Sequence, residues 1–343
     1  MTKLCLIGLD GVRLDVALPN HLAAHAGFAE PSHTGDERFS NGGRDHTTQA
    51  GVDTELAPTL ARLADAGTII PVWMTPPTDS GPGWASILTG TTHEQNNVWD
   101  NEFVGHRLAE APDLLSRVYF ANPRARTYAG VVWDALVSPR GPGPVIHQRV
   151  DQQRGGQHRL FLADDRSDGC ISADVQVRTD AAWTLLREGP DASFVYFEGV
   201  DEAGHQHGPE SAEYRTAIAR VDEHVRYICK AIGERVEKLG EDWICAITTD
   251  HGHHPGGGHG EDEVEVRRSF LIVHRFGPEG LPAPILQAGS LRAEDITPLL
   301  LAAIGVHDAH TDGRHDISDS RQPHTGGPSP RSEQSWPQQR AGS

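Results

Sequence analysis

Short apolar segments alternate with segments of helical spacing along this chain, and this alternation restricts its fold more than any other feature. The apolar segments, which we predict to be strands, are residues 4–9, 68–73, 127–133, 193–197, 243–248 and 270–273. Helical spacing is found at residues 58–66, 111–121, 174–188, 212–239 and 294–304. Strands that alternate with helices build parallel sheets covered on both faces. We therefore predict an α/β fold with a mostly parallel central sheet and helices on both faces.

Reactive side chains follow several of the predicted strands directly. Asp10, Asp201 and Asp250 each come just after an apolar segment. Ser80 comes after the second segment, through a turn rich in proline and glycine. In open α/β sheets, ligands bind at the carboxyl ends of the strands. The sequence therefore predicts that these four residues lie at one edge of the sheet.

The 343 residues are enough for one large α/β domain. We predict a single domain over residues 1–308. Within it, residues 19–53 are polar and rich in Gly, His and Thr, so they form an insertion that is either a lid or disordered. Residues 309–343 consist mostly of Ser, Gly, Pro, Gln and Arg with few apolar residues, which predicts a disordered tail.

The charge of the chain excludes some classes of partner. The formal net charge is -18 at pH 7, whereas nucleic acid polymers and anionic membranes are bound by basic surfaces. No apolar stretch approaches the roughly 20 residues of a membrane span, and the N-terminal segment lacks the apolar core of a signal peptide. The four cysteines form no CxxC pair. We expect a cytoplasmic protein with buried free thiols that binds neither nucleic acid polymers nor membranes.

Asp and His residues occur at spacings that suit metal binding. Asp250 and His251 form a pair after a predicted strand, and both side chain types are good ligands for divalent ions. Asp201 and His205 share one side of a helical turn if a helix begins near Asp201. His259 lies between glycines, which let the backbone approach a metal closely. Each of these patterns alone also fits an ordinary polar loop.

Taken together, these residues form two groups of candidate ligands. The groups are Asp201, His205 and His259, and Asp10, Asp250 and His251. Two divalent ions about 3.5–4 Å apart stabilise both the attacking and the leaving oxygen of an in-line displacement at phosphorus. We expect two divalent ions, with zinc as the first choice for this mixed N/O ligand set and manganese or iron as alternatives.

Ser80 is the candidate nucleophile. It lies at the start of a short predicted helix that ends at Gly90, where backbone N–H groups and the helix dipole favour an anion. A hydroxyl bound to a metal ion is activated without a neighbouring base. Thr75, Thr78 and Ser86 are alternatives, but none of them has this placement.

Five motifs in this order resemble the alkaline phosphatase superfamily, and its nucleotide pyrophosphatase/phosphodiesterase branch in particular. They are IGLDGVR, PTDSGPGWASILTG, VDEAGHQHGP, TTDHGHH and GGGHG, and EDITPLLLAAIGV is similar to the last helix of the family. The resemblance covers nearly the whole chain to about residue 306. It implies an alkaline phosphatase-like fold with two metal sites, at one of which Ser80 joins Asp10, Asp250 and His251. The serine departs from this branch, whose nucleophile is usually threonine.

The function that the resemblance implies is hydrolysis of phosphodiester or pyrophosphate bonds in a nucleotide-like or other small phosphorylated metabolite, through a covalent intermediate on Ser80. The alternative is a phosphomonoesterase, which usually needs an additional cation, for which Arg124 and Arg126 are candidates. Phosphonate hydrolysis and non-catalytic binding of a phosphorylated ligand are further alternatives. The candidate substrate contacts are Trp84, His93, Asn101 and His207.

Overall fold

The computed structural model describes residues 2–29, 56–163 and 165–306 of the chain. Most of the predicted insertion at 19–53 and all of the predicted tail at 309–343 lie outside the described residues. The described start of the insertion forms helix α2 (Pro19–Ala24) and a 3₁₀ turn at Ala26–Phe28.

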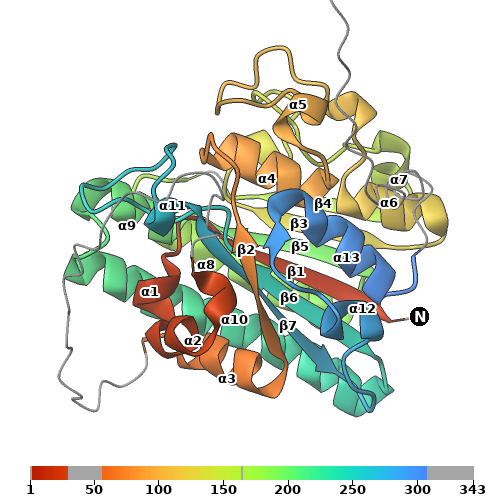
Figure 1. Ribbon diagram of the computed structural model, residues 1–343. Helices are drawn as coiled ribbons and strands as arrows, with labels where there is room; N and C mark the ends of the chain where they lie inside the picture. Colours follow the sequence, from red (N-terminus) through yellow and green to blue (C-terminus); the bar gives the residue numbers. More distant parts are fainter. Residues whose placement is uncertain (1, 30–55, 164, 307–343) are drawn as a thin grey trace, which may run out of the picture. The chain divides into compact units, whose positions relative to one another are not determined.

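A mixed sheet lies at the centre of the protein, and most of its strands are parallel (Figure 1). In the described part of the chain, eight strands follow the order β4-β3-β5-β1-β6-β7-β2-β8. Strand β7 runs antiparallel to both of its neighbours, and the other pairings are parallel. The strands are β1 (Lys3–Leu9), β2 (Thr68–Trp73), β3 (Thr127–Val131), β4 (His158–Leu162), β5 (Ala192–Phe197), β6 (Trp243–Thr248), β7 (Arg268–Phe276) and β8 (Leu291–Arg292).

The predicted, mostly parallel sheet is confirmed, but two of its strands were not predicted. The central strands β1, β5 and β6 are buried almost throughout, and this burial produces the continuous apolar runs that mark them in the sequence. Strand β4 is an edge strand, and four of its five residues are only partly buried. Strand β8 has two residues. Neither edge strand has a run that would distinguish it from a loop.

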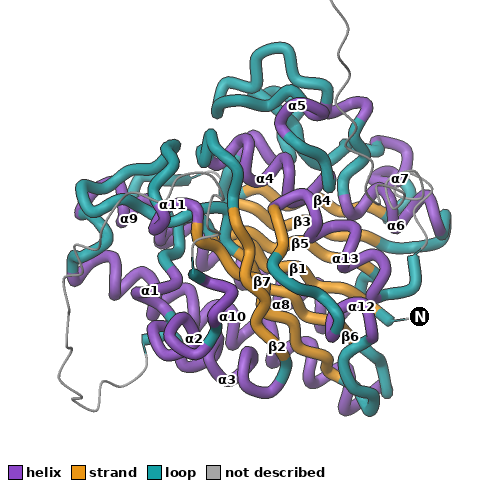
Figure 2. The backbone as a smooth tube through the Cα atoms, viewed as in Figure 1, coloured by secondary structure: helices purple, strands orange, loops and turns teal. Residues whose placement is uncertain are grey.

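Helices cover both faces of the sheet, as predicted (Figure 2). Helices α3, α8 and α10 pack together on one face, and α4, α6 and α13 pack on the other. None of the helices in the described residues is long and apolar enough to cross a membrane. The remaining helix bounds are α1 (Leu14–Ala17), α3 (Pro58–Ala66), α4 (Ser80–Thr89), α5 (His93–Asn96), α6 (Leu114–Ala121), α7 (Val150–Arg154), α8 (Ile171–Arg187), α9 (Gly199–His207), α10 (Ala212–Leu239), α11 (Val264–Arg267), α12 (Ala283–Leu286) and α13 (Ile296–Ala303).

The long helix α10 follows from its sequence pattern. The Ser211 side chain accepts the N–H of Tyr214 and caps the start of the helix, and Gly240 ends it in a left-handed conformation. The apolar residues at helical spacing are all buried: Ile218, Val221, Val225, Ile228 and Ile232.

A tryptophan of α4 enters the core beside the first strand. The Trp84 side chain is fully buried and packs edge-to-face on Tyr196, with ring centroids 5.3 Å apart. Its indole ring occupies space that Gly8 of β1 leaves open, because a Cβ atom on Gly8 would lie 2.5 Å from Cη2 of Trp84. The glycine is therefore a packing requirement of this core.

We expect Gly8→Ala to lower the free energy of unfolding by about 1–3 kcal/mol, the usual effect of overpacking a dense core. Denaturant unfolding measures the change. The matched control is Gly233→Ala in α10, where no atom lies within 4 Å of an added Cβ. The free energy of unfolding of this control should rise by about 0.5–1 kcal/mol, because alanine is more favourable than glycine in a helix interior. Equal stability changes in the two variants would show that Gly8 does not make room for Trp84.

Candidate active site

Three carboxylates meet at the carboxyl ends of three neighbouring strands. Strands β5, β1 and β6 are adjacent and parallel, so their carboxyl ends open at the same edge of the sheet. Asp10 directly follows β1, Asp250 follows β6, and Asp201 lies in the first turn of α9 after β5. All three residues are buried. The topology thus brings together side chains that are far apart in the sequence.

Ser80 reaches the same place from β2, which lies beyond the antiparallel strand β7. Thr78, in the connection between β2 and α4, forms hydrogen bonds to the loop after β6. The Thr78 hydroxyl donates to the carbonyl of Glu261 at 2.9 Å and accepts the N–H of Gly260 at 3.1 Å. As a result, the Oγ atom of Ser80 lies 3.1 Å from Nε2 of His251.

His251 is at the centre of the first group of side chains. Its Nε2 atom lies 3.3 Å from Oδ1 of Asp10 and 3.3 Å from Oδ2 of Asp250. Its Nδ1 atom lies 3.0 Å from the carbonyl oxygen of Gly252. Because a carbonyl oxygen only accepts, Nδ1 carries the proton, and the lone pair of Nε2 faces the two carboxylates and Ser80.

The second group contains the other three predicted ligands. His205 lies one helical turn after Asp201, with Nε2 3.4 Å from Oδ2 of the carboxylate. Nε2 of His259 is 3.1 Å from Nε2 of His205 and 3.5 Å from Oδ1 of Asp201. His259 donates from Nδ1 to the carbonyl of Thr78 at 3.2 Å, so its Nε2 is also free to bind a ligand. The rings of His259 and His251 stack with centroids 3.6 Å apart, so the two groups are adjacent.

The carboxylates of both groups lack hydrogen-bond donors at the atoms that face each other. Oδ1 of Asp10, Oδ1 of Asp201 and Oδ2 of Asp250 are buried and accept no hydrogen bond. Burial, followed by the charge of Asp201, raises the pKa of Asp10 to about 7, and burial with two carboxylate neighbours raises the pKa of Asp250 well above its usual value. Burial lowers the pKa of His259 to about 4, which keeps its ring neutral. Unpartnered carboxyl oxygens beside neutral imidazoles are a donor set that fits divalent cations.

His253, which the sequence analysis did not single out, also lies at this site. It is fully buried, with Nε2 3.1 Å from Oδ1 of Asp201. Its Nδ1 accepts the N–H of Gly258 at 3.2 Å, and no hydrogen bond joins its buried Nε2 to the carboxylate of Asp201. Gly11 and Gly204 leave space for the ring, since a Cβ on either would lie within 2.8 Å of Nε2. The signal was present in TTDHGHH, which places further histidines after the same strand.

Two of the predicted substrate contacts are buried and bonded within the protein. The prediction for Trp84 is wrong, because its indole is completely buried and donates from Nε1 to Oδ2 of Asp10 at 3.0 Å. His93 is buried and uses both ring nitrogens, on the carbonyl of Thr75 at 2.9 Å and the hydroxyl of Ser86 at 3.2 Å. It lines a cavity of about 290 Å³ to which neither candidate ligand group contributes.

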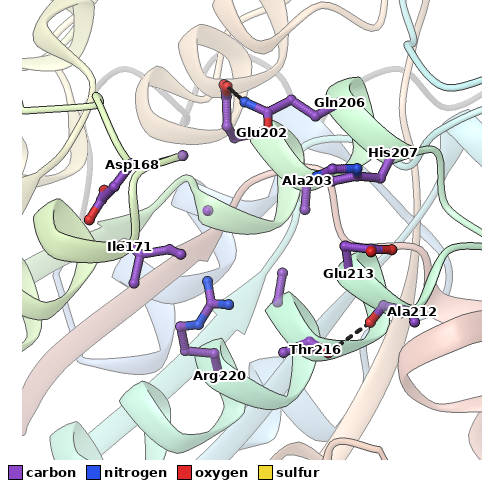
Figure 3. Close-up of a pocket in the computed structure, with 13 residues that line it drawn as sticks. Asp168, Ile171, Glu202, Ala203, Gln206, His207, Ala212, Glu213, Thr216 and Arg220 are labelled. Atoms are coloured by element: carbon purple, nitrogen blue, oxygen red, sulfur yellow. Dashed lines mark hydrogen bonds between the residues drawn. The ribbon is translucent and has the colours of Figure 1, made fainter.

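His207 lines a pocket of about 350 Å³ on the other side of α9 (Figure 3). The pocket lies between α9, the start of α10 and the loop before α8, and Glu202 and Arg220 are among its lining residues. Asp201 and His205 do not line it, because they project from the opposite face of the helix. The predicted contact between His207 and a substrate at Ser80 therefore has no support in the geometry.

Asn101 is the predicted substrate contact that lies beside the nucleophile. Its Oδ1 accepts the N–H of Gly81 at 2.7 Å, and the N–H of Gly83 donates to the carbonyl of Asp79. Pro82 has no N–H. The N–H groups of Gly81 and Gly83 are therefore bonded within the protein, and binding of an anion at the start of α4 stays a prediction. Asn101 is exposed next to Ser80, and its contact with a substrate stays a prediction.

Known sequences match most of the chain. Residues 42–270 match the sequence profile of the family described as type I phosphodiesterase / nucleotide pyrophosphatase. Human GPI ethanolamine phosphate transferase 3, catalytic subunit, is 31% identical over 83 residues, which cover 24% of this chain and 7% of that protein. Rat ectonucleotide pyrophosphatase/phosphodiesterase family member 1 is 27% identical over 221 residues, which cover 59% of this chain and 22% of that protein. The chain thus spans less than a quarter of the length of these relatives.

A solved structure shares the fold over most of its length. Murine ectonucleotide pyrophosphatase/phosphodiesterase 5, in an inactive form in complex with AMP, superimposes with a TM-score of 0.54. The match covers 90% of this chain and 96% of the murine chain at 14% sequence identity. The similarity extends to the whole alkaline phosphatase-like α/β architecture.

Proposed function

Because the chain belongs to the type I phosphodiesterase / nucleotide pyrophosphatase family, we propose that it is a two-metal hydrolase of phosphodiester bonds with Ser80 as its nucleophile. One observation carries this proposal. The Oγ atom of Ser80 lies 3.1 Å from Nε2 of His251, and this nitrogen is 3.3 Å from the carboxylates of Asp10 and Asp250. The hydroxyl therefore lies at the convergence of the ligand atoms.

The two groups of side chains would each hold one divalent ion. The residues are Asp10, Asp250, His251 and Ser80 for one ion, and Asp201, His205 and His259 for the other. Such ions lower the pKa of a bound hydroxyl and offset the charge that develops on the phosphoryl oxygens. Zinc suits three carboxylates and three imidazoles, and manganese or iron accept the same ligands.

In the proposed reaction Ser80 is the nucleophile of the first step and the leaving group of the second. Its hydroxyl loses the proton to solvent and Oγ attacks phosphorus in line, so that the Oγ–P bond forms as the bond to the leaving oxygen breaks. The leaving oxygen takes a proton from water. A water molecule then attacks the phosphorus of the modified serine, releases the phosphomonoester and restores the hydroxyl. Burial of Asp10 and Asp250 keeps water away from the ligand atoms beneath Ser80.

The charges near Ser80 favour a diester over a monoester, which carries one more negative charge. The carboxylate of Asp79 directly precedes Ser80. Arg126, a candidate for the additional cation, pairs with Glu188 at 2.7 Å. This ion pair lies at the amino end of β3, whereas the candidate ligands lie at the carboxyl ends of the strands. We therefore propose a small phosphodiester or pyrophosphate, such as a nucleotide-like metabolite, as the substrate.

Hydrolysis of bis-p-nitrophenyl phosphate beside p-nitrophenyl phosphate tests the proposal. We expect faster release of p-nitrophenol from the diester, loss of activity in EDTA, and recovery with added zinc or manganese. A preference for the monoester would overturn the choice of substrate. Activity that resists EDTA would overturn the role of the metals, and metal-loaded protein that hydrolyses neither compound would overturn the proposed reaction.

A further inference from the structure

The carboxylate of Asp10 is held by side chains that belong to neither candidate ligand group. We propose that Trp84 and Tyr196 are positioning residues for Asp10, and that Gly8 provides the space in which they do so. Together they would fix one carboxylate oxygen so that the other faces the metal. This inference rests on the proposed two-metal function and names residues that govern its metal affinity.

The hydrogen bonds at Asp10 are unevenly divided between its two oxygens. Oδ2 accepts the Tyr196 hydroxyl at 2.5 Å and the Nε1–H of Trp84 at 3.0 Å. Oδ1 accepts no hydrogen bond and lies 3.3 Å from Nε2 of His251. Because the two donors come from different elements, β5 and α4, they restrict rotation of the carboxylate about its Cβ–Cγ bond. The oxygen without a donor is thereby directed at the candidate metal site.

The chemistry of the two donors suits a metal ligand. A phenol and an indole each donate a hydrogen bond without bringing a positive charge. Neither donor offsets the charge that the carboxylate of Asp10 offers to a cation, whereas a Lys or Arg partner would. Side chains that donate hydrogen bonds to a ligating carboxylate orient it in a metal site. Their loss typically weakens metal affinity about 10–100-fold.

Packing makes this arrangement rigid. Trp84 and Tyr196 are almost fully buried, and their rings meet edge-to-face at an interplanar angle of 87°. Trp84 also contacts Phe194, with ring centroids 5.8 Å apart. Gly8 lies in β1 two residues before Asp10, which directly follows the strand. Because Gly8 has no side chain, the indole of Trp84 fills the space beside it.

The test compares Tyr196→Phe and Trp84→Phe with the wild-type full chain, using zinc titrated against a chromophoric chelator. We expect one of two bound zinc ions to bind about 10-fold more weakly in each variant and the other to be unchanged. Two controls remove an equivalent hydrogen bond elsewhere in the core. In Tyr128→Phe the lost bond is that from the hydroxyl to Asp180 at 2.9 Å, and in Trp243→Phe it is that from Nε1 to Glu241 at 2.9 Å.

A purely structural role would lower the melting temperature of the variants, as in the controls, without changing either zinc affinity, and this result would overturn the inference. If Trp84→Phe does not fold, Tyr196→Phe carries the test, because it removes only one oxygen. Wild-type protein that binds no divalent ion would overturn the proposed function itself. Two ions bound with unchanged affinity in the variants would overturn the positioning role alone.

Discussion

Replacement of Ser80 by alanine is expected to lower diester turnover by a factor of about 10³ or more, because it removes the atom that would form the proposed covalent intermediate. Zinc binding by Asp201, His205 and His259 should persist, since Ser80 belongs to the other group. Steady-state hydrolysis of bis-p-nitrophenyl phosphate measures the loss, and zinc titration measures the retained ion. Ser80→Thr should keep part of the activity, because it preserves a hydroxyl at the same position.

The matched control is Ser86→Ala, on the same helix. Ser86 is buried and bonds to His93, but it does not contact either candidate ligand group, so its removal should change turnover no more than a few-fold. Acid quenching of the wild-type reaction and mass spectrometry should detect a phosphorylated peptide that contains Ser80. Near-normal turnover by Ser80→Ala, or a label on another residue, would show that a different nucleophile acts.

The sequence predicts those parts of the fold and the site that depend on strands buried on both faces. Strands β1, β5 and β6 are continuous apolar runs, so their ends could be located, and with them Asp10, Asp201 and Asp250. Edge strand β4 is only partly buried and carries no such run. TTDHGHH places His253 after β6, but the space for its ring is left by Gly11 and Gly204, which are distant in the sequence.

The error at Trp84 has a similar cause. Trp84 follows Ser80 by one helical turn, a spacing at which two side chains lie on the same side of a helix. In the structure the indole instead turns into the core, because Gly8 leaves a space there and Asp10 accepts its N–H. The hydrogen bond of the Gly81 N–H at the start of α4 also depends on a tertiary neighbour, since Asn101 comes from a separate loop to accept it. Local spacing gives the direction of a side chain only when its tertiary neighbours are known.

Replacement of Asp250 by asparagine is expected to have opposite effects on activity and on the stability of the metal-free protein. Turnover should fall about 10³-fold or more, because a carboxylate that would bind the proposed metal beside Ser80 is lost. Without metal, the variant should be more stable than wild type by about 1 kcal/mol or more at pH 8, since a buried charge is removed. Asp250 is fully buried, and its pKa is raised by burial and then by the charges of Asp10 and Asp201.

The pH dependence separates this explanation from a general change in packing. A group with a raised pKa in the folded state destabilises the fold as the pH rises. The gain in stability of Asp250→Asn over wild type should therefore shrink on acidification, when the wild-type carboxyl takes up a proton.

Zinc should stabilise wild type more than the variant, because ligands that bind only the folded state raise its stability. The control is Asp65→Asn, at an exposed carboxylate that lies outside both groups. Thermal unfolding at pH 5 and pH 8, with zinc and with EDTA, measures all of these effects. If the metal-free variant were less stable than wild type at pH 8, interactions within the protein would stabilise the charge of Asp250. The carboxylates without hydrogen-bond donors would then not mark a metal site.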